Sequence, residues 1–189
     1  MIAAGGEGTR LGGAKPARLL GGRRLIDRIG DWARRHSDRV ALAVRSGQDD
    51  WGTGLAVLRD RHAGIGPISA LASAMDEARR LERDSVLLIG CDLPFLPDDL
   101  VPRLRAALPG HGAALPLSGG RLHPMAALWR CEPAALERWI ARGGQSLWRY
   151  AAQAGMAEVA WHEALDPFAN VNDQAALDAA EERLRTARR

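Results

Sequence analysis

The sequence is poor in cysteine, and it has no long apolar run. Cys91 and Cys131 are the only two cysteines, and neither belongs to a CxxC pair or a histidine cluster. This pattern excludes a disulfide scaffold and a zinc site, and it predicts reduced thiols in a cytoplasmic protein. No apolar run reaches the length of a membrane span, and residues 1–4 lead straight into glycine without the pattern of a signal peptide.

Basic residues are numerous but scattered. The 26 Lys and Arg against 23 Asp and Glu leave a net charge of +3, which does not indicate a nucleic-acid surface or a membrane surface. With 189 residues and no repeat, low-complexity segment or linker, the chain is predicted to form one domain over residues 1–189.

Lysine occurs once, at Lys15, and every other basic residue apart from histidine is arginine. Lys15 closes a glycine-rich loop that includes Gly5, Gly6 and Arg10. Glycines let a backbone approach a ligand closely, and the compact ammonium of lysine fits beside a phosphate where a wide guanidinium does not. The loop matches neither a P-loop nor a complete dinucleotide fingerprint. The alternatives are an ordinary glycine-rich connection and a lysine that survives by chance in an arginine-biased chain.

Apolar runs alternate with helical patterns, which is typical of an α/β fold with a mostly parallel sheet. Residues 85–90 are apolar throughout and predict a central parallel strand that is buried on both faces. The remaining pattern predicts strands at 2–4, 39–44, 55–58, 113–116, 125–129 and 158–161, and helices over 25–35, 68–81, 97–107, 133–141, 145–154 and 174–185.

Carboxylates follow two of the predicted strands. Asp92 comes after the apolar run 85–90, and Asp60 comes after the strand at 55–58 and before the Gly66-Pro67 start of a helix. Ligands of open α/β sheets bind beyond the carboxyl ends of strands, where a carboxylate can hold Mg²⁺ together with phosphate oxygens. Alternatively, Asp92 caps a turn before Pro94 and Asp60 is a polar turn residue.

Two further segments carry candidate ligand-binding side chains. His123, before Pro124, either contacts a ligand or is a hydrogen-bonded structural residue. Asn170 and Asn172 alternate, so they point the same way in an extended segment. They either bind a ligand or organise the cap of the last helix, and the cap role is strongest for Asn172 and Asp173.

Taken in order, these segments resemble the molybdenum cofactor guanylyltransferases, the MobA-like branch of the nucleotidyltransferases. The resemblance runs from about residue 3 to residue 177. It rests on segments that are similar to the family patterns LAGGxxxRMG followed by Lys, DxxxGxGPLAG, CDxP, HP and FxNVN: residues 3–15, 60–70, 91–94, 123–124 and 168–172.

The resemblance implies a Rossmann-like, three-layer α/β/α fold and a Mg²⁺-dependent reaction. GMP passes from GTP to the phosphate of molybdopterin, and pyrophosphate leaves. The acceptor phosphate oxygen is already a nucleophile, so positioning and charge neutralisation suffice, which agrees with the lack of a catalytic triad or a carboxylate dyad. The family's partners are then small molecules, with transient contacts to proteins that supply molybdopterin and to recipient molybdoenzymes.

The resemblance also implies roles for individual residues. The nucleotide site is formed by Arg45, Asp60 and the backbone of Ala3, Ala4, Gly5 and Gly6. Lys15 binds the phosphates, Asp92 holds Mg²⁺, and Arg10 stabilises the departing pyrophosphate. The residues that lie towards the pterin are His123, Asn170 and Asn172.

The sequence departs from the family pattern at three points that leave alternatives open. Ala14 replaces the usual Asp before Lys15 in a loop that is one residue shorter, Pro16 follows the lysine, and Arg45 stands where the family often has an Asn near the base. The alternatives are a cytidylyltransferase of the same cofactor, a nucleotidyltransferase for another phosphorylated acceptor, and a nucleotide-binding assembly protein without activity. The Gly66-Pro67 element counts against the cytidylyl branch.

Overall fold

The computed structural model describes residues 1–5, 15–45, 47–48, 50–62 and 64–187. Its strands are β1 (Ile2–Ala3), β2 (Leu19–Leu20), β3 (Arg23–Arg24), β4 (Ala41–Val44), β5 (Ala56–Arg59), β6 (Ser85–Gly90), β7 (Ala113–Ser118), β8 (Arg121–Leu122), β9 (Ala126–Arg130) and β10 (Met156–Trp161). Its helices are the 3₁₀ turn η2 (Lys15–Ala17), α1 (Leu25–His36), α2 (Pro67–Arg80), α3 (Leu100–Ala107), α4 (Pro133–Ala141), α5 (Leu147–Ala154) and α6 (Gln174–Thr186).

One eight-stranded sheet runs through the described part of the chain in the order β10-β7-β9-β6-β1-β4-β5, with β8 paired to β7. The neighbours β6, β1, β4 and β5 are all parallel, whereas β9 is antiparallel to both β6 and β7. Because parallel strands share a direction, the chain leaves β1, β4, β5 and β6 at the same edge of the sheet. That edge carries Gly5, Arg45, Asp60 and Asp92.

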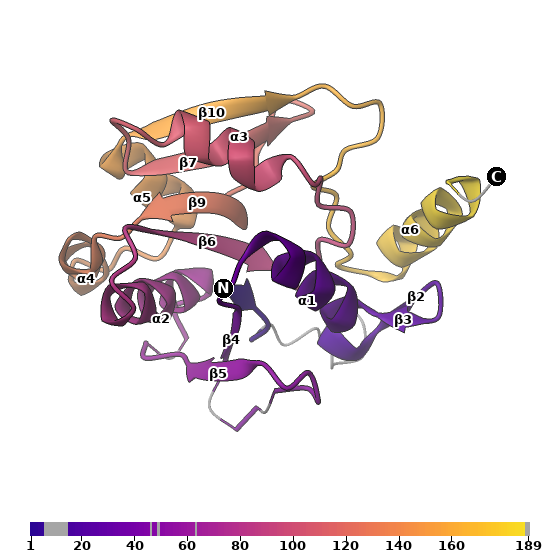
Figure 1. Cartoon of the computed structure of the whole chain (residues 1–189), viewed down its shortest axis with the longest axis horizontal. Helices are drawn as coiled ribbons and strands as arrows, with labels where there is room; N and C mark the ends of the chain where they lie inside the picture. Colours follow the sequence, from indigo (N-terminus) through magenta and orange to yellow (C-terminus); the bar gives the residue numbers. More distant parts are fainter. Residues whose placement is uncertain (6–14, 46, 49, 63, 188–189) are drawn as a thin grey trace.

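Helices cover both faces of the sheet, which confirms the predicted three-layer α/β/α arrangement (Figure 1). Apolar side chains of α1 and α3 pack on one face, with Ile29 and Leu104 fully buried. Helices α2, α4 and α5 pack on the other face, where Leu71 and Leu136 are buried. Helix α6 lies apart, against the β2–β3 hairpin, and closes a small cluster around Leu20 and Val171.

The predicted helices match except at α3. Residues 97–99 precede this helix, which begins at Leu100, so the predicted start at residue 97 was wrong. The amide of Leu100 donates to the carbonyl of Pro97, which shows that residues 97–100 form a turn before the helix. Pro102 still falls in the first turn of α3, where a missing N–H costs nothing.

The predicted strands also match, with two differences. The short strands β2, β3 and β8 were not predicted, because two-residue ladders carry no periodicity. Strand β6 is central and parallel to β1, as expected, but its other neighbour is antiparallel, and only its last half, Leu88–Gly90, is buried.

Candidate active site

Three predicted site residues meet beyond the carboxyl end of β6. The ammonium Nζ of Lys15 donates to Oδ2 of Asp92 over 2.8 Å and also to Oδ1 of Asn172. The side chains of Lys15 and Asp92 are only 13% and 17% exposed, so this ion pair is largely sheltered from water. Two oxygen acceptors therefore converge on one cation, which is an arrangement that can neutralise phosphate oxygens or hold a hard metal ion.

The backbone around Asp92 explains why these side chains meet. The carbonyl of Asp92 accepts the amide of Val171 over 2.9 Å, which brings the segment before α6 alongside the end of β6. Asn172 is the next residue, whereas Asp173 turns away and caps α6 by accepting the amide of Ala176 over 2.9 Å. Asn172 therefore faces the site, and its neighbour Asp173 caps the last helix.

Gly90 leaves room for the Asp92 carboxylate. A Cβ atom added at Gly90 would lie 2.4 Å from Oδ1 of Asp92, far inside van der Waals contact. The carboxylate folds back over the last residue of β6, and only glycine permits this position.

A second group of predicted residues lies on the other side of β1. A Cβ atom placed on Gly5 would lie 3.2 Å from Cγ of Arg45 and 3.5 Å from Oδ2 of Asp60. The amide of Asp60 donates to the carbonyl of Val44, which continues the pairing of β4 and β5 past their ends. Gly5, Arg45 and Asp60 therefore form one wall beyond the ends of β1, β4 and β5, whereas Asp92 follows β6, the neighbour of β1 on the opposite side.

Asp60 has an unused acceptor. Its Oδ1 is buried and, among the described residues, has no hydrogen-bond partner. Burial raises the pKa of this carboxyl group above its ordinary value, and the positive charge of Arg45 opposes that rise. A buried oxygen without a donor is costly, so it points to a donor that a ligand supplies.

His123 lies against the segment that leads to Asn172. Its ring packs on Phe168 with the centroids 5.0 Å apart, and its buried Nε2 lies 3.9 Å from Oδ2 of Asp166, beyond hydrogen-bond distance. Burial lowers the pKa of His123; Asp166 opposes this change, as does a bond to the backbone of Ser118, while Arg121 adds to it. The neutral imidazole is therefore favoured in the folded protein.

The roles of some other predicted site residues are not tested by the described contacts. Gly6 and Arg10 lie outside the described residues. The carbonyl of Ala3 and the amide of Ala4 bond to Cys91 and Ala43 within the sheet, and Asn170 is exposed. Their predicted roles stay predictions.

Two neighbours of the site were missed from the sequence. Gln48 accepts the amide of Arg45 through Oε1 over 3.0 Å, and Asp166 accepts the amide of Phe168 over 2.9 Å. Asp166, two residues before Phe168, has the spacing of a turn-forming Asx residue, which was the available signal. Gln48 carries no such signal.

Comparison with known proteins identifies the family. The family model of the MobA-like NTP transferase domain matches residues 1–158. The chain belongs to this family. It is accordingly a nucleotidyltransferase.

Two relatives show how far the likeness extends. The molybdenum cofactor guanylyltransferase of Acidiphilium cryptum is 39% identical over 186 residues, which cover 96% of this chain and 92% of the relative. That of Rhodobacter capsulatus is 36% identical over 195 residues, covering 98% and 95%. The predicted resemblance to this family is confirmed.

Solved structures share the fold. Molybdopterin-guanine dinucleotide biosynthesis protein A from Archaeoglobus fulgidus superposes with a TM-score of 0.76 at 21% identity, over 98% of this chain and 97% of that one. The 2-C-methyl-D-erythritol 4-phosphate cytidylyltransferase from Thermus thermophilus gives a TM-score of 0.72 at 19% identity, over 97% of each chain. At these identities the likeness shows a shared fold.

The oxygen atoms of the Asp92 carboxylate fit a magnesium ion whose other ligands are phosphate oxygens. Within the described ranges, no three His, Cys, Asp or Glu side chains gather as a metal site. Magnesium often takes only one or two carboxylates and completes its shell with water and substrate phosphates, so the carboxylate of Asp92 fits it. This carboxylate already faces a cation, the ammonium of Lys15.

Proposed function

We propose that this chain transfers GMP from GTP to the terminal phosphate of molybdopterin and releases pyrophosphate. The observation that carries the proposal is the contact of Lys15 with Asp92 and Asn172 at the end of β6, in a chain that matches named guanylyltransferases over almost its whole length. Residues 1–189 then act as one nucleotidyltransferase domain, since one sheet contains all the described strands except those of the β2–β3 hairpin.

The wall formed by Gly5, Arg45 and Asp60 is the base side of the site. Guanine presents two adjacent donors, N1–H and the 2-amino group, and a carboxylate can accept from both. The buried Oδ1 of Asp60, which has no donor among the described residues, supplies such an acceptor. Burial raises the pKa of this carboxyl group, and the charge of Arg45 opposes that rise. Cytosine lacks this pair of donors, so Asp60 favours GTP over CTP.

The cluster of Lys15, Asp92 and Asn172 is the phosphate side. The bond from the acceptor phosphate oxygen to the α-phosphorus forms while the bond to the bridging oxygen breaks, and pyrophosphate carries the electron pair away. Lys15 lies where it can neutralise the charge on the α-phosphate oxygens, and Asn172 orients the ammonium. Mg²⁺, held by Asp92, would add Lewis-acid stabilisation of the same charge.

The remaining assignments follow the sequence. Asn170 and His123 are proposed to lie on the pterin side, and Arg10 to face the leaving pyrophosphate. Asn172, which was predicted to lie towards the pterin as well, contacts Lys15 and is proposed to act on the phosphate side. A cytoplasmic location and transient contacts with molybdopterin-supplying proteins and recipient molybdoenzymes stay predictions. In the described part of the chain, no helix is both long and apolar enough to cross a membrane.

The test is a turnover assay with the purified chain, molybdopterin, Mg²⁺ and either GTP or CTP. We expect dinucleotide and pyrophosphate in equal amounts from GTP and little product from CTP. The matched control is Asp92→Asn, which should lower turnover by roughly 100-fold or more while GTP still binds. Product from CTP alone would favour the cytidylyl alternative, and GTP binding without product would favour an assembly protein.

A further inference from the structure

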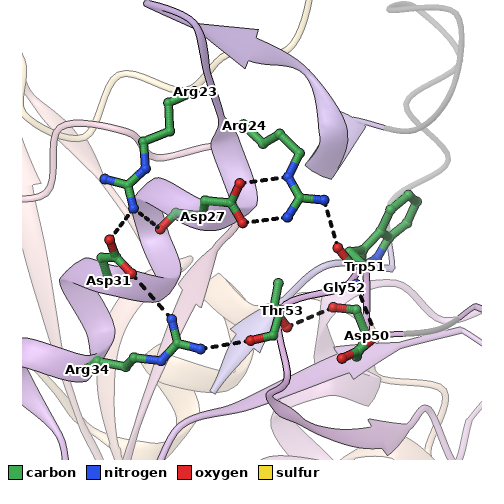
Figure 2. Close-up of polar contacts among 9 residues, drawn as sticks. All are labelled: Arg23, Arg24, Asp27, Asp31, Arg34, Asp50, Trp51, Gly52 and Thr53. Atoms are coloured by element: carbon green, nitrogen blue, oxygen red, sulfur yellow. Dashed lines mark hydrogen bonds and ion pairs between the residues drawn. The ribbon is translucent and has the colours of Figure 1, made fainter.

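A network of charged side chains joins α1 to the loop between β4 and β5 (Figure 2). Asp27, Asp31 and Arg34 follow one another at spacings of four and three residues, so they share one face of α1. Arg24, the N-cap residue before the helix, joins this face through its bonds to Asp27. Arg24 grips Asp27 through two bonds of 2.6 and 2.7 Å. This face is turned towards residues 50–54 rather than towards solvent alone.

Two arginines of this face bind backbone carbonyls of the loop. Nη1 of Arg24 donates to the carbonyl of Trp51 over 2.8 Å, and Nη2 of Arg34 donates to the carbonyl of Thr53 over 2.9 Å. The carboxylate of Asp27 accepts from the guanidinium of Arg24, and that of Asp31 accepts from the guanidinium of Arg34. The pairs thus orient each arginine for a carbonyl that lies 27 or 19 residues away in the chain.

The loop is built to receive these contacts in one conformation. Asp50 accepts the amides of Gly52 and Gly54 over 3.0 and 2.8 Å, and its carbonyl accepts the amide and the hydroxyl of Thr53. Trp51 has a φ of 55°, an unusual value for a side chain of this size. The carbonyls of Trp51 and Thr53 therefore occupy fixed positions that the arginines can bind.

The same connection carries the base-side wall. The carbonyl and the amide of Arg45 are both bound by Gln48, and Arg59, just before Asp60, donates to the carbonyl of Gln48 over 3.3 Å. Residues 50–54 and Gln48 belong to the same connection between β4 and β5, whose ends carry Arg45 and Asp60. Helix α1 also packs against η2, which carries Lys15.

We propose that Arg24 and Arg34 are positioning residues that set the base-side wall at a fixed separation from the phosphate-binding Lys15. This inference rests on the proposed function, because it concerns how that site reads the base. Neither arginine touches substrate; both act through the loop and Gln48. Their role is to make the contact of a guanine with Asp60 compatible with phosphates at Lys15.

The test compares Arg24→Ala and Arg34→Ala with Arg23→Ala. Arg23 is the matched control, since its bonds go to Asp31 and the carbonyl of Asp27 within α1. Calorimetric titrations with Mg²⁺ use GTP, ATP and inorganic tripolyphosphate. We expect Arg24→Ala to weaken GTP binding roughly tenfold and to lower the ratio of GTP to ATP affinity. Tripolyphosphate, which has no base, should bind as to the wild type, and Arg23→Ala should match the wild type throughout.

A merely stabilising role would lower the melting temperature without moving the ratio of GTP to ATP affinity, and that result would overturn the proposal. Equal losses for GTP and tripolyphosphate would also overturn it. Arg24→Lys, which keeps the charge, and Arg34→Ala, which leaves the start of α1 intact, carry the test if Arg24→Ala fails to fold. Amide exchange of residues 50–54 in the free protein is independent of the reaction: it should speed up in Arg24→Ala and not in Arg23→Ala. A wild type that binds no GTP would contradict the proposed function, whereas unchanged exchange in Arg24→Ala would contradict the positioning role alone.

Discussion

Replacing Lys15 with alanine tests whether the cation at the end of β6 compensates a charge that the fold has largely buried. The substitution removes the donor to Asp92 and to Asn172. It leaves the carboxylate of Asp92, only 17% exposed, without its cation. The free protein should therefore become less stable, and the loss should be traceable to Asp92.

The magnitude follows from the burial of the pair. A buried charged group that loses its partner costs about 1–3 kcal/mol or more, and the remaining exposure of Asp92 lets water recover part of this. We expect a loss of about 1–2 kcal/mol in the free energy of unfolding, which corresponds to roughly 2–8 °C in melting temperature for a chain of this size. The double variant Lys15→Ala/Asp92→Asn no longer buries a lone charge and should regain about 1 kcal/mol relative to additivity.

Urea unfolding of the wild type, both single variants and the double variant in EDTA measures this coupling. Mg²⁺ should stabilise Lys15→Ala more than the wild type, because the metal no longer competes with an ammonium. Lys15→Arg keeps the charge and should recover part of the stability but not the turnover, since the wider guanidinium does not fit the same position. Single-variant effects that add within about 0.5 kcal/mol would refute the idea that Lys15 compensates Asp92.

Three further substitutions give expected outcomes. Gly90→Ala should displace the Asp92 carboxylate, whose Oδ1 would lie 2.4 Å from the new Cβ, and cut turnover by at least about tenfold with GTP binding less affected; unchanged turnover would contradict the close approach of these two residues. His123→Gln should flatten the pH dependence of stability. Burial lowers the pKa of His123 below 6.5, so as the pH falls the unfolded chain binds a proton before the folded chain does. The wild type therefore loses stability as pH falls from about 6.5 towards the folded pKa. Urea titrations at several pH values check this slope, and an equal slope in both proteins would refute it. Asp173→Ala removes the cap that binds the amide of Ala176 and should cost about 1 kcal/mol in thermal unfolding while turnover persists, whereas a large loss of turnover would place Asp173 in the site.

Much of the sheet edge was predictable from strand pattern alone. Asp60 and Asp92 each follow an apolar run, and parallel strands deliver their ends to one edge, so both were expected near the ligand. The pairing of Lys15 with Asp92 was not predicted, although β1, which precedes Lys15 in the chain, pairs with β6. The structure resolves the ambiguity at residues 172–173, where Asn172 faces Lys15 and Asp173 caps α6.

The remaining features depend on contacts that leave no local pattern. The bonds of Arg24 and Arg34 go to backbone carbonyls, which every residue has, so no residue type marks the acceptor. The late start of α3 depends on the turn at residues 97–100, although Pro97 is a favourable first residue of a helix. The burial of Asp60 and of the ring of His123 arises from packing between distant segments, which periodicity does not report.

The division of the site into a base side at Asp60 and a phosphate side at Lys15 is the central claim, and nucleotide selectivity of Asp60→Asn tests it most directly. Xanthine carries a carbonyl oxygen where guanine carries its 2-amino group, and an asparagine amide can donate to that oxygen. The measurement is the affinity of the wild type and of Asp60→Asn for GTP and XTP, with inosine triphosphate, which lacks the 2-amino group, as the control. The account predicts that the variant loses about 10- to 100-fold in GTP affinity and comes to prefer XTP, while tripolyphosphate binding stays unchanged. An unaltered ratio of GTP to XTP affinity in Asp60→Asn would contradict it.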